Sequence, residues 1–276
     1  AFAADANIDT YYKDRLGIIY STNANETNGY KDKALDLYLA LQEADPNNEI
    51  WISRVTGLAE DENQLMDFKK KAWELNKDNI EKAWTYANTC LRFKSYDRAV
   101  EPLEFLVKKA PEVVNYMKEL ARCYDKLEEK AKALEAYKTL IKLDPENKDN
   151  YVNIAIIYKD MEQLSTARNF LRQASKIDPS WDYPIFIEAQ LYEHAVRSCG
   201  SFEFMDRCVY QYAVSTYQKC RSLGGQFASR ASDRISALSS TVPQKEDYFF
   251  RKLGSGTTIR IEGGCYNWIG GSIVVP

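Results

Sequence analysis

Histidine and serine are side chains of this 276-residue chain that could support nucleophilic catalysis, but histidine is scarce. The chain has one histidine, His194, so a histidine-based triad has one possible base. Ser198 and Ser201 lie near it, but neither stands in the strand, turn and helix context that exposes a nucleophilic serine. We interpret His194 as a partly exposed residue near a helix end, and we predict that the protein is not an enzyme.

The six cysteines do not form a metal-binding pattern. The spacing CxxC is absent, and a single histidine makes a mixed zinc site weaker still. Cys90 and Cys220 occupy positions at which a buried thiol would serve as a packing residue. Cys199 and Cys208 instead bracket an insertion, and we predict a disulfide between them that stabilises this loop by about 2–3 kcal/mol. No metal site is expected.

Other functional classes are disfavoured by composition. Gly254-Ser255-Gly256 lacks the spacing and the strand and helix context of a phosphate loop, and we predict no cofactor. A net charge of −3 gives no basic surface for nucleic acid. No apolar run approaches the roughly 18 to 20 residues that span a bilayer, so we predict no membrane span.

The first residues suggest a cellular location. The sequence Ala1-Phe2-Ala3-Ala4-Asp5 is like the small-residue end of a secretory signal peptide. A disulfide would also require an oxidising compartment. We therefore expect a periplasmic or extracellular protein, with the cytoplasm as the alternative.

A repeat of 34 residues organises the chain. Ala87, Ala121, Ala155 and Ala189 are spaced at this interval. Two antiparallel helices can cross closely only where a methyl group replaces a larger side chain, so these alanines mark helix crossings. Three further columns of residues keep the period: Ala99, Ala133 and Ala167; Pro111, Pro145 and Pro179; and Tyr124, Tyr158 and Tyr192. The prolines end one helix and set up the next.

The columns predict helices at 79–93 and 96–109, 113–126 and 130–142, and 147–160 and 164–176. An earlier pair has its first helix at 7–21, and residues 49–79 form a degenerate repeat. Ala213 follows Ala167 by 46 residues, 12 more than the period, which places an insertion between Cys199 and Cys208. Residues 226–240 read as a capping helix that covers the last apolar face.

The tail after Phe250 changes to β-forming residues separated by two Gly-Gly pairs. Tight hairpins use glycine for positive φ, so we predict a three-stranded antiparallel meander with strands at 257–262, 265–269 and 272–275. Its apolar face is expected to lie on the last helices, with Tyr248, Phe249 and Phe250 as anchors. The meander is then a cap, and the alternative is a free edge strand that pairs with a partner. The domains are 7–240 for the helices and 245–276 for the tail.

The period, the alanine and aromatic columns and the prolines resemble the tetratricopeptide repeat family, here of a bacterial envelope type. The resemblance covers roughly residues 7–225 and holds in every column over 77–192. It implies an all-α fold, a right-handed superhelix of about six helical pairs with the capping helix and the small β module. It also implies a concave groove, lined by the first helix of each pair, that binds a protein or peptide without catalysis.

The second, fifth, ninth and twelfth positions of each repeat line that groove in the family. The binding residues expected here are Trp84, Asn88, Lys118, Arg122, Asn153, Ile156, Lys159, Tyr183, Phe186 and Gln190. Some relatives capture a carboxylate with a clamp of basic and asparagine residues. Lys118 and Asn153 match that clamp, whereas Arg122, Tyr183 and Ile187 depart from it.

Two functions are therefore weighed. The first is a scaffold that binds a protein or peptide of unknown identity through the groove. The alternative is a cell-envelope carbohydrate-binding or enzyme-accessory protein that acts through its C-terminal module. In that alternative, Tyr183, Phe186, Tyr266 and Trp268 would stack on sugar rings.

Overall fold

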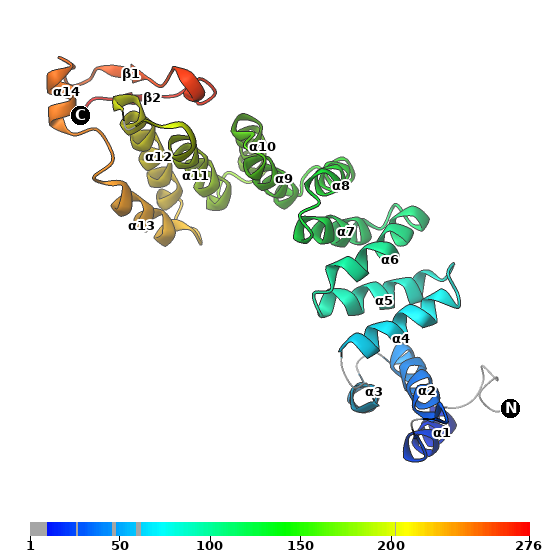
Figure 1. Cartoon of the computed structure of the whole chain (residues 1–276). Coiled ribbons are helices and arrows are strands. Elements are labelled where there is room, and N and C mark those ends of the chain that lie inside the picture. The colour runs from blue at the N-terminus through cyan, green and yellow to red at the C-terminus, as the bar shows by residue number, and fades with distance from the viewer. Residues whose placement is uncertain (1–9, 26, 46–47, 59–61, 202) are drawn as a thin grey trace. The chain divides into compact units, whose positions relative to one another are not determined.

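The computed structural model describes residues 10–25, 27–45, 48–58, 62–201 and 203–276, and most of this length is helical (Figure 1). The chain divides into two compact units, the first ending at Tyr116 and the second beginning at Met117. The amino-terminal residues from which a signal peptide was expected, and residues 7–9 of the first expected helix, lie outside the described residues.

The first unit contains helices α1 to α6. Their bounds are α1 Thr10–Thr22, α2 Tyr30–Ala44, α3 Glu49–Leu58, α4 Glu62–Glu74, α5 Ile80–Arg92 and α6 Tyr96–Lys109. Helix α1 packs on α2, and α5 packs on α6. Gly17 permits the first of these approaches, because a Cβ atom at this position would lie 2.6 Å from the ring of Tyr38.

The second unit contains the later helices and the tail. The helices are α7 Val114–Lys126, which begins before the boundary, α8 Lys130–Leu143, α9 Lys148–Asp160, α10 Leu164–Ile177, α11 Asp182–Cys199, α12 Phe204–Ser222, α13 Ala228–Leu238 and α14 Lys245–Phe250. Helices α9 and α10 form one antiparallel pair and α11 and α12 the next. From α5 to α10, the helix bounds expected from the columns agree with these to within one residue.

The alanine columns lie at the helix crossings, as the period predicts. All seven are fully buried, namely Ala87, Ala99, Ala121, Ala133, Ala155, Ala167 and Ala189. Each turn between the two helices of a pair also repeats. Lys94, Glu128 and Glu162 share positive φ values of 59°, 57° and 59°. In each turn, the N–H of the residue that follows donates a hydrogen bond to the carbonyl five residues before it. This bond satisfies a carbonyl that would otherwise be unpaired at the end of the first helix.

Replacing Ala155 by leucine is expected to lower the free energy of unfolding by about 1–3 kcal/mol. The Ala155 side chain is fully buried in a cluster that also contains Ala167 and Leu171, so added methylenes must displace neighbouring atoms. Urea denaturation measures the change. The matched control is Ala131→Leu, at an exposed alanine of α8. Equal midpoints for the two variants would mean that the Ala155 column does not face the core.

The insertion between Cys199 and Cys208 lengthens two helices, and the prediction of a long inserted loop is wrong. Helix α11 has 18 residues and α12 has 19, whereas α9 and α10 of the preceding pair have 13 and 14. Asp206 is the third residue of α12 and forms a capping box with Glu203, the residue before the helix. This capping box stabilises the start of the lengthened helix. The extra turns give this pair a surface that the other pairs lack.

The tail covers these extra turns, but it has two strands and not the three of the predicted meander. Strands β1 Thr258–Arg260 and β2 Ser272–Val274 pair antiparallel, with Ile259 opposite Ile273. The segment expected to be the middle strand contains a 3-10 turn, Gly264–Tyr266. Tyr266 and Ile269 are both buried. A helical turn places residues three apart on one side, whereas a strand places them on opposite faces.

The buried tail residues pack on α11 and α12. Ile261, Tyr266 and Ile269 belong to one apolar cluster with Tyr192, Ala195, Val196, Val209 and Ala213, and Figure 1 shows the tail beside these two helices. Helix α13 caps the other part of the unit through Ala231, Ile235 and Leu238, as expected. Of the three aromatic anchors expected at the start of the tail, Tyr248 is buried, while Phe249 and Phe250 are exposed.

Candidate functional site

The predicted groove residues of the first unit are Trp84 and Asn88, both on α5. Asn88 is exposed to solvent, while Trp84 is half-buried. The Trp84 ring lies 5.2 Å from the ring of Tyr116, at an interplanar angle of 46°. Trp84 therefore packs on an aromatic neighbour and keeps only part of its surface for a ligand.

In the second unit, α7 presents two cations to solvent. Lys118 and Arg122 are both exposed and are four residues apart, so they lie on the same face of the helix. Arg122 Nη1 is 3.1 Å from Glu119 Oε2, an ion pair between neighbouring turns. Glu119 is half-buried, so this pair holds part of the guanidinium against the helix while Arg122 itself stays exposed.

Helix α9 contributes a half-buried apolar side chain between two polar ones. Asn153, Ile156 and Lys159 are spaced by three residues and share one face. Ile156 packs against the core cluster with part of its surface exposed. Lys159 Nζ is 3.4 Å from Asp160 Oδ1. Ile154 and Ile157, which lie between these residues in the sequence, are buried in the core. The face with Asn153, Ile156 and Lys159 is therefore the one that keeps its contact with solvent.

Of the two aromatic anchors expected on α11, Phe186 is buried and Tyr183 is half-buried. Phe186 is buried, with its ring 5.4 Å from Tyr217 and 5.1 Å from Phe227. Tyr183 stacks on Phe227 at 4.5 Å, and burial raises the pKa of its hydroxyl. Phe227, just before α13, covers both rings, which is why a groove assignment for Phe186 is wrong. Gln190, farther along α11, is half-buried and keeps some exposure.

We name the remaining set the first-helix surface. It consists of Lys118, Arg122, Asn153, Ile156, Lys159 and Gln190, all in the second unit. The set combines three cations, two amides and one apolar side chain, so it is mainly polar.

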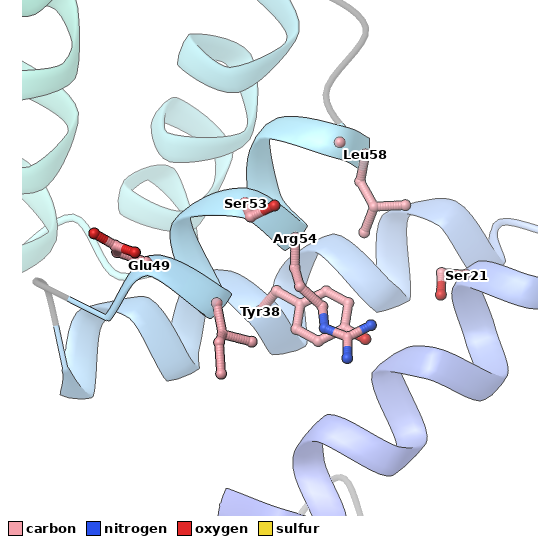
Figure 2. A pocket seen from close by; sticks show the side chains of 8 residues that line it. Ser21, Tyr38, Glu49, Ser53, Arg54 and Leu58 are labelled. Atoms are coloured by element: carbon pink, nitrogen blue, oxygen red, sulfur yellow. The ribbon is translucent and has the colours of Figure 1, made fainter.

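A separate pocket of about 580 Å³ lies in the first unit, between α1, α2 and α3. Figure 2 shows Arg54 lying against the ring of Tyr38, with Ser21 and Leu58 nearby. The Arg54 guanidinium carbon is 5.3 Å from that ring's centre, and its Nε is 3.4 Å from Asp14 Oδ1. Asp14 thus balances the positive charge, so the pocket does not provide an uncompensated cation for an anionic ligand. No repeat column passes through these residues, and sequence reasoning missed the pocket.

His194 lies beside a second cavity, of about 480 Å³, lined by the start of α10, the end of α11 and the tail. Its Nε2 is 2.8 Å from Glu162 Oε2 and 3.3 Å from Ser198 Oγ. A catalytic triad needs the acid on one imidazole nitrogen and the nucleophile on the other. Both partners here share Nε2, so this arrangement does not activate Ser198.

A disulfide joins Cys199 to Cys265 at the edge of that cavity, and the predicted pairing of Cys199 with Cys208 is wrong. Cys208 is a free, fully buried thiol on α12, and burial raises its pKa to about 12. Because the insertion is helical, the Cys208 side chain faces the core, while the tail brings Cys265 to the end of α11. Cys90 and Cys220 are buried thiols, as expected, and burial raises the pKa of each to about 11.

Two buried carboxylates, which sequence reasoning did not single out as structural, hold the last helices and the tail together. Glu193 Oε1 accepts hydrogen bonds from Tyr217 Oη at 2.5 Å and from Arg234 Nε at 3.1 Å. Asp206 Oδ1 accepts one from Tyr266 Oη at 2.5 Å. Burial and the hydrogen bond to Asp206 raise the pKa of the Tyr266 hydroxyl. Both acids have full sets of partners, so neither is poised for acid or base chemistry.

The aromatic residues expected to stack on sugars do not form a common platform. Trp268 stacks on Tyr192 at 5.7 Å, and the guanidinium carbon of Arg168 lies 5.2 Å from its ring centre. The Tyr266 hydroxyl is held by Asp206, and Phe186 packs at the opposite end of α11. These rings are committed to packing, and nothing in their arrangement favours a carbohydrate site.

Comparison with known proteins agrees with this architecture. The tetratricopeptide repeat family model matches residues 114–147 and again residues 149–180. These segments correspond to α7 with α8 and to α9 with α10. Residues 114–180 are therefore tetratricopeptide repeats. Such repeats indicate a protein-interaction scaffold.

Solved structures similar to this chain include the crystal structure of MamA, at 18% identity and a TM-score of 0.51, covering 66% of this chain and 98% of that one. A second MamA structure gives 16% identity and a TM-score of 0.48, covering 80% and 94%. MamA residues 41 to the end from Desulfovibrio magneticus RS-1 give 18% and 0.42, covering 63% and 97%. At these identities the first likeness shows the fold alone. No curated protein matches the sequence.

Among the residues that the structure describes, no group of three or more His, Cys, Asp and Glu side chains is arranged to hold a metal ion. None of the described helices combines the length and apolarity needed to cross a membrane.

Proposed function

We propose that this protein is a non-enzymatic scaffold that binds a protein or peptide segment on the first-helix surface of its second unit. The single observation that carries the proposal is the partial exposure of Ile156 between Asn153 and Lys159 on α9. An apolar side chain with polar groups one turn away on either side can bury itself against a ligand. The flanking groups can meanwhile bond the ligand's backbone or side chains.

Charge indicates the chemistry of the ligand. Lys118 and Arg122 on α7 and Lys159 on α9 are cations, and the two on α7 are exposed. Arg122 pairs with the half-buried Glu119 and Lys159 with the neighbouring, exposed Asp160, and an acidic segment would compete with these acids for the two cations. We therefore propose a segment with an apolar residue followed or preceded by acidic ones.

We also propose that the protein works in an oxidising compartment, either a bacterial periplasm or the extracellular space. The Cys199–Cys265 disulfide supports this location, because such bonds persist where thiols are not kept reduced.

Substituting Ile156 by serine is expected to weaken binding of selected peptides at least about fivefold, since the apolar centre of the surface is lost. Peptides are selected from a random library on the oxidised wild-type protein, and affinities are measured by calorimetry. Lys118→Gln with Arg122→Gln should reduce the dependence of binding on salt. The matched control is Met161→Ser, which removes an apolar side chain of 38% exposure from the turn after α9.

The result against the proposal is equally specific. If Ile156→Ser and the double charge variant bind the selected peptides as wild type does, the first-helix surface is not the site. If deletion of residues after Asp247 alone abolishes binding in a variant that keeps its helical circular dichroism, recognition lies in the tail.

A further inference from the structure

Two adjacent phenylalanines on α14 are the most exposed large apolar side chains among the described residues. Phe249 is 77% exposed and Phe250 is 79% exposed. Their rings contact each other edge to face, with centroids 5.8 Å apart. Single exposed apolar residues are common on protein surfaces, but two neighbouring phenylalanines with no core partner form a patch that costs solubility.

The packing of α14 directs these two phenylalanines toward solvent. Tyr248 is buried, with its ring 6.1 Å from Phe204, so the next two residues of the helix point away from the core. Asp247 fixes the start of α14 by accepting from Gln244 N at 2.8 Å and from Arg207 Nη1 at 3.1 Å. The guanidinium carbon of Arg251 sits 4.0 Å from the centre of the Phe204 ring. The pair is therefore preorganised, and binding needs little further ordering of α14.

The charges around the pair are mainly positive. Lys245, Arg251 and Lys252 are exposed, with Glu246 as the exposed carboxylate among them. Asp247 is balanced by Arg207. Three cations against one exposed carboxylate leave an excess of two positive charges here, on a chain whose net charge is −3. This local excess is complementary to an anionic surface.

We propose that α14 is a membrane-contact element that inserts Phe249 and Phe250 into the interface of an anionic lipid bilayer. Aromatic rings enter the boundary between headgroups and acyl chains, while lysine and arginine stay at the level of the phosphates. A bilayer accepts a protruding wedge without a matching pocket, which suits side chains exposed to this degree. The element shares no residue with the first-helix surface, so the two proposals are tested independently.

Vesicle co-sedimentation of the oxidised full chain tests the proposal. The vesicles are phosphatidylcholine alone, or phosphatidylcholine with phosphatidylglycerol in equimolar amounts. The wild type is expected to bind the anionic vesicles, more weakly at high salt. Phe249→Ser with Phe250→Ser should weaken binding at least about tenfold. Lys245→Gln with Lys252→Gln should weaken it about fivefold for each cation removed.

Leu143→Ser removes an exposed apolar residue from α8 and should bind vesicles as wild type does. Each variant must keep the wild-type melting temperature, which is expected because both phenylalanines lie outside the core. Absence of wild-type binding to anionic vesicles overturns the proposal, as does equal binding by the double phenylalanine variant. If that variant instead loses concentration-dependent self-association in sedimentation, the patch is an interface between copies of the chain.

Discussion

Replacing Cys265 by serine is expected to lower the free energy of unfolding of the second unit by about 4 kcal/mol. The bond it removes joins residues separated by 66 positions, and a cross-link over a loop of this length restricts the unfolded chain strongly. The measurement is urea denaturation of oxidised protein, followed by the circular dichroism of the helices. Reduced wild type should unfold at the same urea concentration as the variant, and reductant should leave the variant unchanged.

Peptide mapping identifies the bonded pair directly. Without reduction, Cys199 and Cys265 should escape alkylation even after unfolding, whereas Cys90, Cys208 and Cys220 should react only once the protein is unfolded. Burial raises the pKa of these three thiols, which disfavours the reactive thiolate in the native state. Recovery of Cys199 linked to Cys208 would contradict the structure and restore the pairing expected from the sequence.

Replacing Phe186 by alanine is expected to destabilise the second unit by about 3–5 kcal/mol. The side chain is 6% exposed and lies between the rings of Tyr217 and Phe227, so its removal opens a cavity among aromatic groups. Thermal and urea denaturation measure the effect. Phe186→Leu, which keeps most of the volume, is the control and should cost less.

The same variant separates packing from recognition. If Phe186→Ala melts with the wild type but loses affinity for the selected peptides, the ring is exposed in solution and serves the ligand. A loss of both stability and affinity is the expected result, and it reflects the damaged core near the start of α11.

The helices and their crossings were predictable because the period records the packing itself. Ala87, Ala121 and Ala155 occupy crossings at which any larger side chain would separate two helices, so the spacing alone locates them. The turns follow from the same constraint, since Lys94 and Glu128 adopt the same left-handed conformation 34 residues apart. Local geometry that recurs in every 34-residue repeat can therefore be predicted from a single sequence.

The binding surface was only partly predictable, because a column fixes the direction of a side chain but not what covers it. Trp84, Lys118, Val152 and Phe186 occupy the same position of successive repeats. Lys118 is exposed, Trp84 is half-buried, and Val152 and Phe186 are buried. Phe186 is covered by Phe227, which belongs to no repeat. The exposure of each position therefore depends on neighbours outside the pattern.

The tail was misjudged for a related physical reason. Its Gly-Gly pairs are compatible with hairpin turns, but Gly263 and Gly264 lead into a 3-10 turn. Asn267 Oδ1 accepts a hydrogen bond from Gly263 N at 2.8 Å and stabilises this turn. Packing of Tyr266 and Ile269 on α11 and α12 favours the helical spacing over the strand. Tertiary contact, which the tail sequence does not contain, decides the conformation.

The unequal helix lengths restrict how such a protein can grow by duplication. The two repeats over residues 114–180 have helices of the same lengths and the same turn between them. A duplicated repeat inserted there would therefore pack against helices of its own length. A copy placed after α12 would face a pair whose helices are longer by five residues each and whose outer surfaces are already covered. The number of repeats can therefore change within this segment, while the carboxyl end keeps a fixed boundary.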